Sequence, residues 1–214
     1  MEKHLPYFKL IEELNKKECP ICKIIKEEID LYCQNLFYEY INDVSFRKAF
    51  RENFGFCNFH NYLLISYRDV LGISILLKDL FEILQKRRKN SFFKKKTKCL
   101  LCNLEEDISK RYISIIADFK EDKEFREKYL NSCGLCIPHY DMLKKYCRTI
   151  PTYIVEHQKE MEKYYLNYLE KDIDKLNYKG IEIKNFSPIY EEAAKFLWGY
   201  KYSYKKISPN VPIK

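Results

Sequence analysis

The sequence lacks several features that would identify a common enzyme or a membrane protein. It contains no glycine-rich phosphate loop, no G-x-S-x-G motif and no H-E-x-x-H motif. No apolar run approaches the roughly 18 residues that a membrane span requires. The first residues also contain no unbroken apolar stretch of the kind found in export signals. We therefore expect a folded, soluble, cytoplasmic protein.

Cysteine, in contrast, is frequent, with 9 residues in a chain of 214. The odd count and the lack of an export signal argue against a secreted disulfide scaffold. Four of the cysteines form two Cys-x-x-Cys pairs, Cys19 with Cys22 and Cys99 with Cys102. In a reducing compartment, thiols at this spacing more often hold a metal ion.

The chain matches itself at a shift of 80 and then 79 residues, which indicates an internal duplication. The first Cys-x-x-Cys pair falls on the second, and Phe46-Arg47 falls on Phe125-Arg126. The segment Gly55-Phe-Cys57-Asn-Phe-His60 falls on Gly134-Leu-Cys136-Ile-Pro-His139. We predict a first metal-binding repeat over residues 1–90, a second over 91–178, and a C-terminal helix and tail over 179–214.

Apolar residues recur at helical spacing in both copies, so the predicted fold is all-α. Each copy is predicted to be two helices joined by a short segment. Gly72 and Pro151 occupy equivalent positions, and either residue can break or kink a helix, so a bend is expected at both. The segment from Pro188 to Tyr200 predicts a further helix that packs back on the body.

The cysteine pairs and the two Cys-x-x-His pairs together predict two tetrahedral Cys3His sites, each for one zinc ion. Within each sequence copy, the two pairs combine to form one site. The predicted ligands are Cys19, Cys22, Cys57 and His60 in the first copy and Cys99, Cys102, Cys136 and His139 in the second. Both kinds of pair are expected at helix N-termini, where the dipole stabilises anionic thiolates.

Other uses of these residues remain open. The same thiolates and histidines could hold an iron–sulfur cluster, or the Cys-x-x-Cys pairs could be redox dithiols. Cys133 forms an additional Cys-x-x-Cys pair with Cys136 in the second copy only. We interpret it as a spare or buried thiol, and competition as a metal ligand is the alternative. Core packing is the favoured role for Cys33 and Cys147.

These motifs resemble a family of uncharacterised bacterial proteins that carry a CPxC motif and a G-[FL]-C-x-x-H motif, followed by the same pair again. The resemblance covers roughly residues 19 to 170, and the second cysteine pair departs from it by reading CLLC. That family is a domain of unknown function. The resemblance therefore implies metal sites and no particular activity.

Four protein ligands per ion leave no open position for a substrate, so we predict a non-enzymatic adaptor or regulatory protein that binds a protein partner. A nucleic-acid-binding protein is the competing prediction. The formal charge is +8, and the segment Gln85 to Lys98 surrounds Phe92 and Phe93 with basic residues that could neutralise phosphates. These are Lys86, Arg87, Arg88, Lys89, Lys94, Lys95, Lys96 and Lys98. The same segment could lie on an anionic membrane surface.

Overall fold

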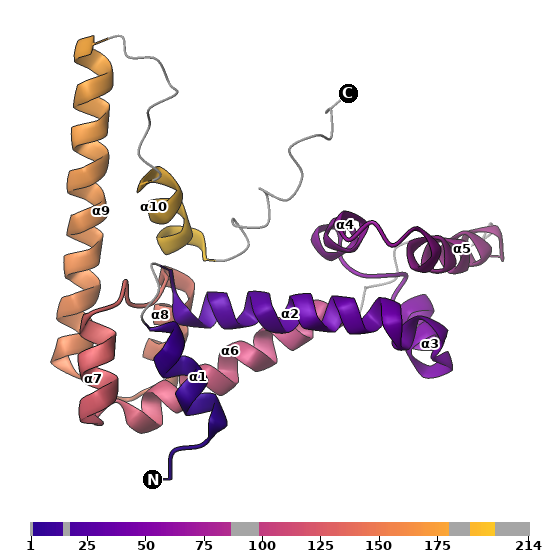
Figure 1. Cartoon of the computed structure of the whole chain (residues 1–214), viewed down its shortest axis with the longest axis horizontal. Coiled ribbons are helices and arrows are strands. Elements are labelled where there is room, and N and C mark those ends of the chain that lie inside the picture. Colours follow the sequence, from indigo (N-terminus) through magenta and orange to yellow (C-terminus); the bar gives the residue numbers. More distant parts are fainter. Residues whose placement is uncertain (1, 15–17, 87–98, 180–188, 200–214) are drawn as a thin grey trace. The chain divides into compact units, whose positions relative to one another are not determined.

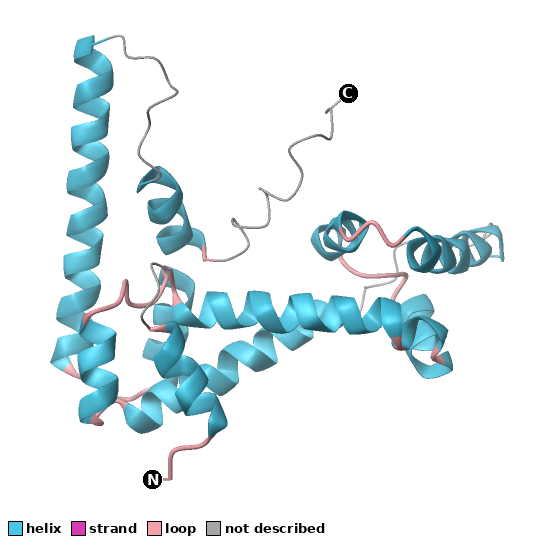
Figure 2. Cartoon of the chain, in the orientation of Figure 1, coloured by secondary structure: helices cyan, strands magenta, loops and turns pink. Residues whose placement is uncertain are grey.

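A computed structural model describes residues 2–14, 18–86, 99–179 and 189–199 (Figure 1). Figure 2 shows that these residues form helices and loops, with no strand among them, so the predicted all-α fold is confirmed. The helices are α1 (Leu5–Glu13), α2 (Pro20–Tyr38), the 3-10 helix η1 (Tyr40–Asn42), α3 (Val44–Glu52), α4 (Asn58–Ser66), α5 (Val70–Lys86), α6 (Leu100–Phe119), α7 (Lys123–Leu130), α8 (Ile137–Tyr146), α9 (Thr152–Lys179) and α10 (Ile189–Trp198). None of the helices in these ranges is both long and apolar enough to cross a bilayer.

Both sequence copies contain the same order of helices, α2 to α5 in the first and α6 to α9 in the second. Among the described residues, four α-helices therefore correspond between the copies, where two were predicted, and the first copy also contains α1 and η1. The short helices α3 and α7 even begin in the same way, because the Asp43 and Asp122 side chains accept hydrogen bonds from the backbone N–H groups of Phe46 and Phe125. The two copies thus share this order of helices and this helix cap.

One helix ends and the next begins near both positions where a bend was expected. In the second copy α8 ends at Tyr146 and α9 begins at Thr152, directly after Pro151. In the first copy α4 ends at Ser66 and α5 begins at Val70, so Gly72 lies inside the first turn of α5. A Cβ atom at Gly72 would lie 2.6 Å from Cδ1 of Phe37. Close packing therefore accounts for this glycine better than a helix break does.

The described residues form two compact units that differ from the sequence copies. One unit contains residues 2–25 and 108–199, and the other contains residues 26–107. The boundary passes through α2 and through α6, so each unit combines parts of both copies. The boundaries at residues 90 and 178 mark the copies in the sequence and cut across these units.

The unit of residues 2–25 and 108–199 is built around a core that includes α1, which sequence analysis did not predict. Tyr7, Leu10 and Leu14 of this segment are almost completely buried. The Tyr7 hydroxyl also donates a hydrogen bond of 2.9 Å to Asp122 at the start of α7. The predicted C-terminal helix is present as α10, which contacts α8 and α9 and buries Phe196 against Tyr165.

The unit of residues 26–107 contains a partly buried ion pair between α3 and α5. Asp79 is 2% exposed and accepts a hydrogen bond of 2.8 Å from Nε of Arg47. The Arg47 guanidinium holds the pKa of the Asp79 carboxyl below its usual range. In the second copy Arg126, the counterpart of Arg47, instead lies over the ring of Tyr153 at 5.1 Å. The equivalent arginines of the two copies therefore make different contacts, an ion pair at Arg47 and a cation–π contact at Arg126.

Candidate metal centres

The eight predicted ligands come together in two groups, each with four donor atoms that all lie within 4.8 Å of one another. Centre 1 consists of Cys19, Cys22, Cys136 and His139. Centre 2 consists of Cys57, His60, Cys99 and Cys102. Each group offers three sulfurs and one imidazole nitrogen and could hold a metal ion. Centre 1 belongs to the unit of residues 2–25 and 108–199, and centre 2 to the unit of residues 26–107.

The predicted assignment of ligand pairs to centres is wrong. The Cys-x-x-Cys pair of each copy meets the Cys-x-x-His pair of the other copy. Helix lengths give a physical reason. With a rise of about 1.5 Å per residue, α2 carries the chain about 28 Å away from Cys19, and α3 covers only about 13 Å before Cys57 is reached. The second copy has the same imbalance between α6 and α7, so neither copy closes its own site.

All four ligand pairs lie at helix N-termini, as predicted. Cys57 and Cys136 are the N-cap residues of α4 and α8. Cys19 and Cys99 directly precede α2 and α6. The carbonyl oxygen of each of these cysteines accepts the first hydrogen bond of its helix. The donors to Cys19, Cys57, Cys99 and Cys136 are the backbone N–H groups of Lys23, Asn61, Asn103 and Tyr140, in that order. The second ligand of each pair follows three residues later, about one helical turn on, and so faces the same side.

Centre 1 is fully buried. Nδ1 of His139 lies 3.1 Å from Sγ of Cys136, 3.4 Å from that of Cys22 and 3.5 Å from that of Cys19. The sulfurs of Cys22 and Cys136 are 3.5 Å apart. The other ring nitrogen of His139, Nε2, points away from the sulfurs and lies 3.2 Å from Oγ of Ser109 on α6. This contact fixes the orientation of the ring.

Centre 2 has the same arrangement with a different outer partner. Nδ1 of His60 lies 3.2 Å from Sγ of Cys57 and 3.5 Å from those of Cys99 and Cys102. The sulfurs of Cys57 and Cys102 are 3.7 Å apart. Nε2 of His60 lies 2.8 Å from Oε1 of Glu105, a buried carboxylate on α6. Cys57 and Cys102 are half-buried, whereas Cys99 is buried.

The electrostatics of centre 2 favour partial ionisation. Burial raises the pKa of Cys99, but hydrogen bonds from His60 and from the backbone N–H groups of Cys57 and Cys102 outweigh it and bring the pKa to about 6. Burial and the negative charge of Cys99 then raise the pKa of Cys102 to about 12. Burial lowers the pKa of His60, yet its hydrogen bonds to Cys99 and Glu105 raise that pKa to about 9. Cys102 therefore needs a further positive charge in the centre before it can ionise beside the Cys99 thiolate.

Centre 1 shows the same competition between its sulfurs. Burial raises the pKa of Cys19, but hydrogen bonds from Cys136 and Cys22 place it well below the usual range. Burial and the hydrogen bond to Cys136 raise the pKa of Cys22. A bound cation would remove this competition, because it stabilises every thiolate at once.

The remaining cysteines lie outside the two groups of donors. Cys33 is buried in α2, and burial raises its pKa to about 12. Cys147 is half-buried at the C-terminal cap of α8. Cys133 is half-buried and lines a cavity beside centre 1 together with Cys19 and Cys136. The interpretation of Cys133 as a spare thiol agrees with this placement.

The outer partners of the two histidines, Glu105 and Ser109, were not predicted from the sequence. Their counterparts in the first copy, at the shift of 80, are Ile25 and Ile29, so the internal alignment gave no signal for them. Glu105 follows Cys102 by about one helical turn, so its position beside a predicted ligand was the one signal in the sequence for a contact with the metal centre. The basic residues from Arg87 to Lys98 lie outside the described part of the chain, as does the side chain of Lys86.

Comparisons with known proteins show a family relationship. The family of unknown function DUF6062 matches residues 2–71 and 76–208. An uncharacterized 23.9 kDa protein in the xynA 3'region of Caldicellulosiruptor sp. (strain Rt8B.4) is 26% identical over 186 residues, which cover 81% of this chain and 90% of that protein. No solved structure matches the chain. The family match extends beyond the motifs into the C-terminal segment, and the chain belongs to the family of unknown function DUF6062.

Proposed function

We propose that the protein binds two zinc ions, one in each centre. The spacing of the donor atoms carries this proposal. Around a tetrahedral zinc ion with Zn–S of about 2.3 Å and Zn–N of about 2.0 Å, two sulfurs lie about 3.8 Å apart, and a sulfur and a nitrogen about 3.5 Å apart. The corresponding distances are 3.5 and 3.7 Å between sulfurs and 3.1 to 3.5 Å between sulfur and nitrogen. Three thiolates and one imidazole are also a preferred donor set for zinc.

The same spacing argues against an iron–sulfur cluster. In a cluster the protein ligands bind different iron atoms that are separated by bridging sulfides, which spreads the cysteine sulfurs apart. Four donors within 4.8 Å of one another instead fit a single ion. The sulfur–sulfur distances also exceed the roughly 2.05 Å of a disulfide, which argues against oxidised dithiols in this arrangement.

A structural role fits these centres better than a catalytic one. Four protein ligands close the coordination sphere of zinc, so no position remains for a substrate or an activated water. Each ion would join the starts of two helices, α2 with α8 in centre 1 and α4 with α6 in centre 2. A Cys3His–Zn²⁺ centre carries a net charge of −1, which the positive ends of two helix dipoles stabilise.

On this basis the protein acts as a non-enzymatic adaptor or regulatory protein that binds a protein partner. Affinity capture at low and high salt separates this role from nucleic-acid binding. Retention of one protein across the salt range supports the adaptor. Loss of bound nucleic acid with a steep salt dependence would instead favour the basic segment of residues 85–98 as a phosphate-binding surface.

Elemental analysis of anaerobically purified protein, with a visible spectrum of the same sample, tests the metal assignment. We expect about two zinc ions per chain and no colour, because zinc has a filled d shell. Iron with sulfide and a broad visible absorbance would overturn the proposal and make electron transfer or redox sensing the leading function.

The contact between Glu105 and His60 gives a prediction for zinc affinity. A carboxylate that accepts a hydrogen bond from the outer nitrogen of a ligand histidine increases its basicity, and loss of such a partner typically weakens metal binding by about 10- to 100-fold. Glu105→Gln should therefore weaken centre 2 by a factor in that range and leave centre 1 unchanged. Competition with a chromophoric chelator measures both affinities.

Ser109→Ala is the matched control, since Ser109 contacts the outer nitrogen of His139 in centre 1. A neutral hydroxyl adds less basicity than a carboxylate, so its loss should weaken centre 1 by a smaller factor. Equal effects of the two substitutions, or an effect of Glu105→Gln on centre 1, would contradict the roles assigned to these side chains.

A further inference from the structure

The C-terminal helix closes one of the two centres. Gly199, which follows α10 directly, has φ of +74°, and a Cβ atom placed on it would lie 3.4 Å from Sγ of both Cys22 and Cys136. Its backbone N–H donates a hydrogen bond of 2.8 Å to the carbonyl of Lys195. The end of α10 therefore lies against two sulfurs of centre 1, and only a residue without a side chain fits there without strain.

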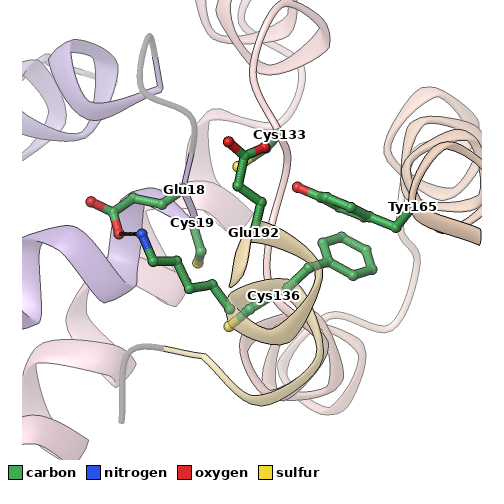
Figure 3. A pocket seen from close by; sticks show the side chains of 8 residues that line it. Glu18, Cys19, Cys133, Cys136, Tyr165 and Glu192 are labelled. Atoms are coloured by element: carbon green, nitrogen blue, oxygen red, sulfur yellow. Dashed lines mark ion pairs between the residues drawn. The ribbon is translucent and has the colours of Figure 1, made fainter. Parts of the chain in front are cut away.

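A small cavity lies between α10 and centre 1, beside these sulfurs. Figure 3 shows Cys19 and Cys136 lining it together with Cys133, Glu192 and Tyr165. An ion pair of 3.5 Å between Lys195 of α10 and Glu18 lies in the same wall (Figure 3). Despite the cavity, Cys19 is only 6% exposed and Cys136 only 1% exposed. Solvent and reagents thus have little access to centre 1.

Centre 2 has less protection. Cys57 and Cys102 are half-buried, although they occupy positions equivalent to Cys136 and Cys22, which are buried. Helix α10 follows the second copy, and the described residues contain no counterpart of it after the first copy. The two centres thus share one donor set and differ in access to it. Reactivity of a thiolate follows this access.

We propose that centre 2 is a reactive thiolate centre, in which Cys57 and Cys102 are sites of covalent modification by soft carbon electrophiles, whereas centre 1 is closed by α10 and keeps its ion. This inference rests on the proposed zinc binding. In the reaction a thiolate sulfur attacks the electrophilic carbon, a sulfur–carbon bond forms, and the leaving group departs with the bonding electron pair. The neutral thioether is a poor ligand, so centre 2 then releases its zinc ion.

Alkylation of the zinc-loaded full chain with iodoacetamide tests this inference, in a Cys147→Ser background that removes one half-buried thiol outside the centres. Mass spectrometry gives the rate at each cysteine, and a chromophoric chelator reports released zinc. We expect Cys57 and Cys102 to react about 10-fold or more faster than Cys19, Cys22 and Cys136. One zinc ion should be released in the fast phase. Equal rates in the two centres, or faster reaction of centre 1, would overturn the inference.

Gly199→Val provides a matched test of closure by α10. A β-branched side chain at positive φ and in contact with two sulfurs is strained, so the end of α10 should move away from centre 1. Alkylation of Cys22 and Cys136 should then accelerate at least about 10-fold, toward the rates of centre 2, which stay unchanged. Leu197→Ala, at an exposed side chain of the same helix, is the control and should leave all rates unaltered.

Two results separate this inference from the proposed function. A chain that is purified without zinc contradicts both. A chain with two zinc ions whose centres react at the same rate retains the proposed function and contradicts only the difference between the centres. If Gly199→Val fails to fold, the site-resolved rates of the Cys147→Ser chain still decide the question.

Discussion

Replacing Cys22 and His60 together by alanine should remove both zinc ions, whereas replacing Cys22 and His139 together should remove only one. Cys22 and His139 belong to centre 1, and His60 belongs to centre 2. A Cys3His centre that has lost one of four ligands holds zinc weakly, so a second loss in the same centre has little further effect. Loss of one ligand from each centre should therefore remove the zinc ions from both centres.

Zinc content by elemental analysis and thermal denaturation of the same samples measure this difference. The two substitutions within centre 1 should be strongly non-additive in the free energy of unfolding, with a coupling of about 0.5 to 3 kcal/mol or more. Those in different centres should be closer to additive. Cys147→Ser is the control and should retain two ions per chain. Loss of one ion from the Cys22 and His60 double variant would instead support the pairing within each sequence copy.

This exchange of partners marks the limit of what the sequence predicted about the site. Each ligand pair is a local feature, because three residues of spacing at a helix start place two donors on one face. The eight residues could therefore be identified from the motifs. Which pairs meet is a property of the tertiary structure, since both pairings give two sites of the same Cys3His composition, although their members differ.

Sequence separation was a poor guide to this choice. Cys22 lies 35 residues from Cys57, the predicted partner, and 114 residues from Cys136, the observed one. Loop-closure entropy grows only with the logarithm of loop length, so the longer connection costs about 1 kcal/mol more. The lengths of α2 and α6, which carry the chain away from Cys22 and Cys102 before it turns back, therefore outweigh this small cost.

The fold class and the long helices could also be predicted from the sequence, whereas the short helices could not. Long amphipathic stretches gave the all-α class, and Pro188 correctly marked the beginning of the C-terminal helix, which starts at Ile189. The short helices were not predicted. In α3 Phe50 is the one buried residue, too few for a periodic pattern. Helix α1 was not predicted either, although Tyr7, Leu10, Ile11 and Leu14 recur at spacings of three and four, which is typical of a helix.

Removal of both zinc ions by a strong chelator should abolish the cooperative thermal unfolding of the chain. Apparent binding free energies of structural zinc sites are about 10 to 16 kcal/mol at neutral pH, and the whole stability of a typical domain is about 5 to 15 kcal/mol. Each centre is the junction between segments far apart in the sequence, such as Cys22 and Cys136 in centre 1. Loss of the ion also leaves crowded thiols in each centre, of which Cys22 and Cys102 have raised pKa values and take up protons.

Circular dichroism and differential scanning calorimetry before and after chelation measure this effect. The expected result is a large loss of helical signal and of the melting transition, both of which return when two equivalents of zinc are added back under reducing conditions. Magnesium added at the same concentration is the control, because a hard cation does not replace zinc at thiolate ligands. A chelated chain that kept its cooperative transition would show that the helices pack without the ions. The centres would then be accessory to the fold, and their role would lie in the reactivity of their thiolates.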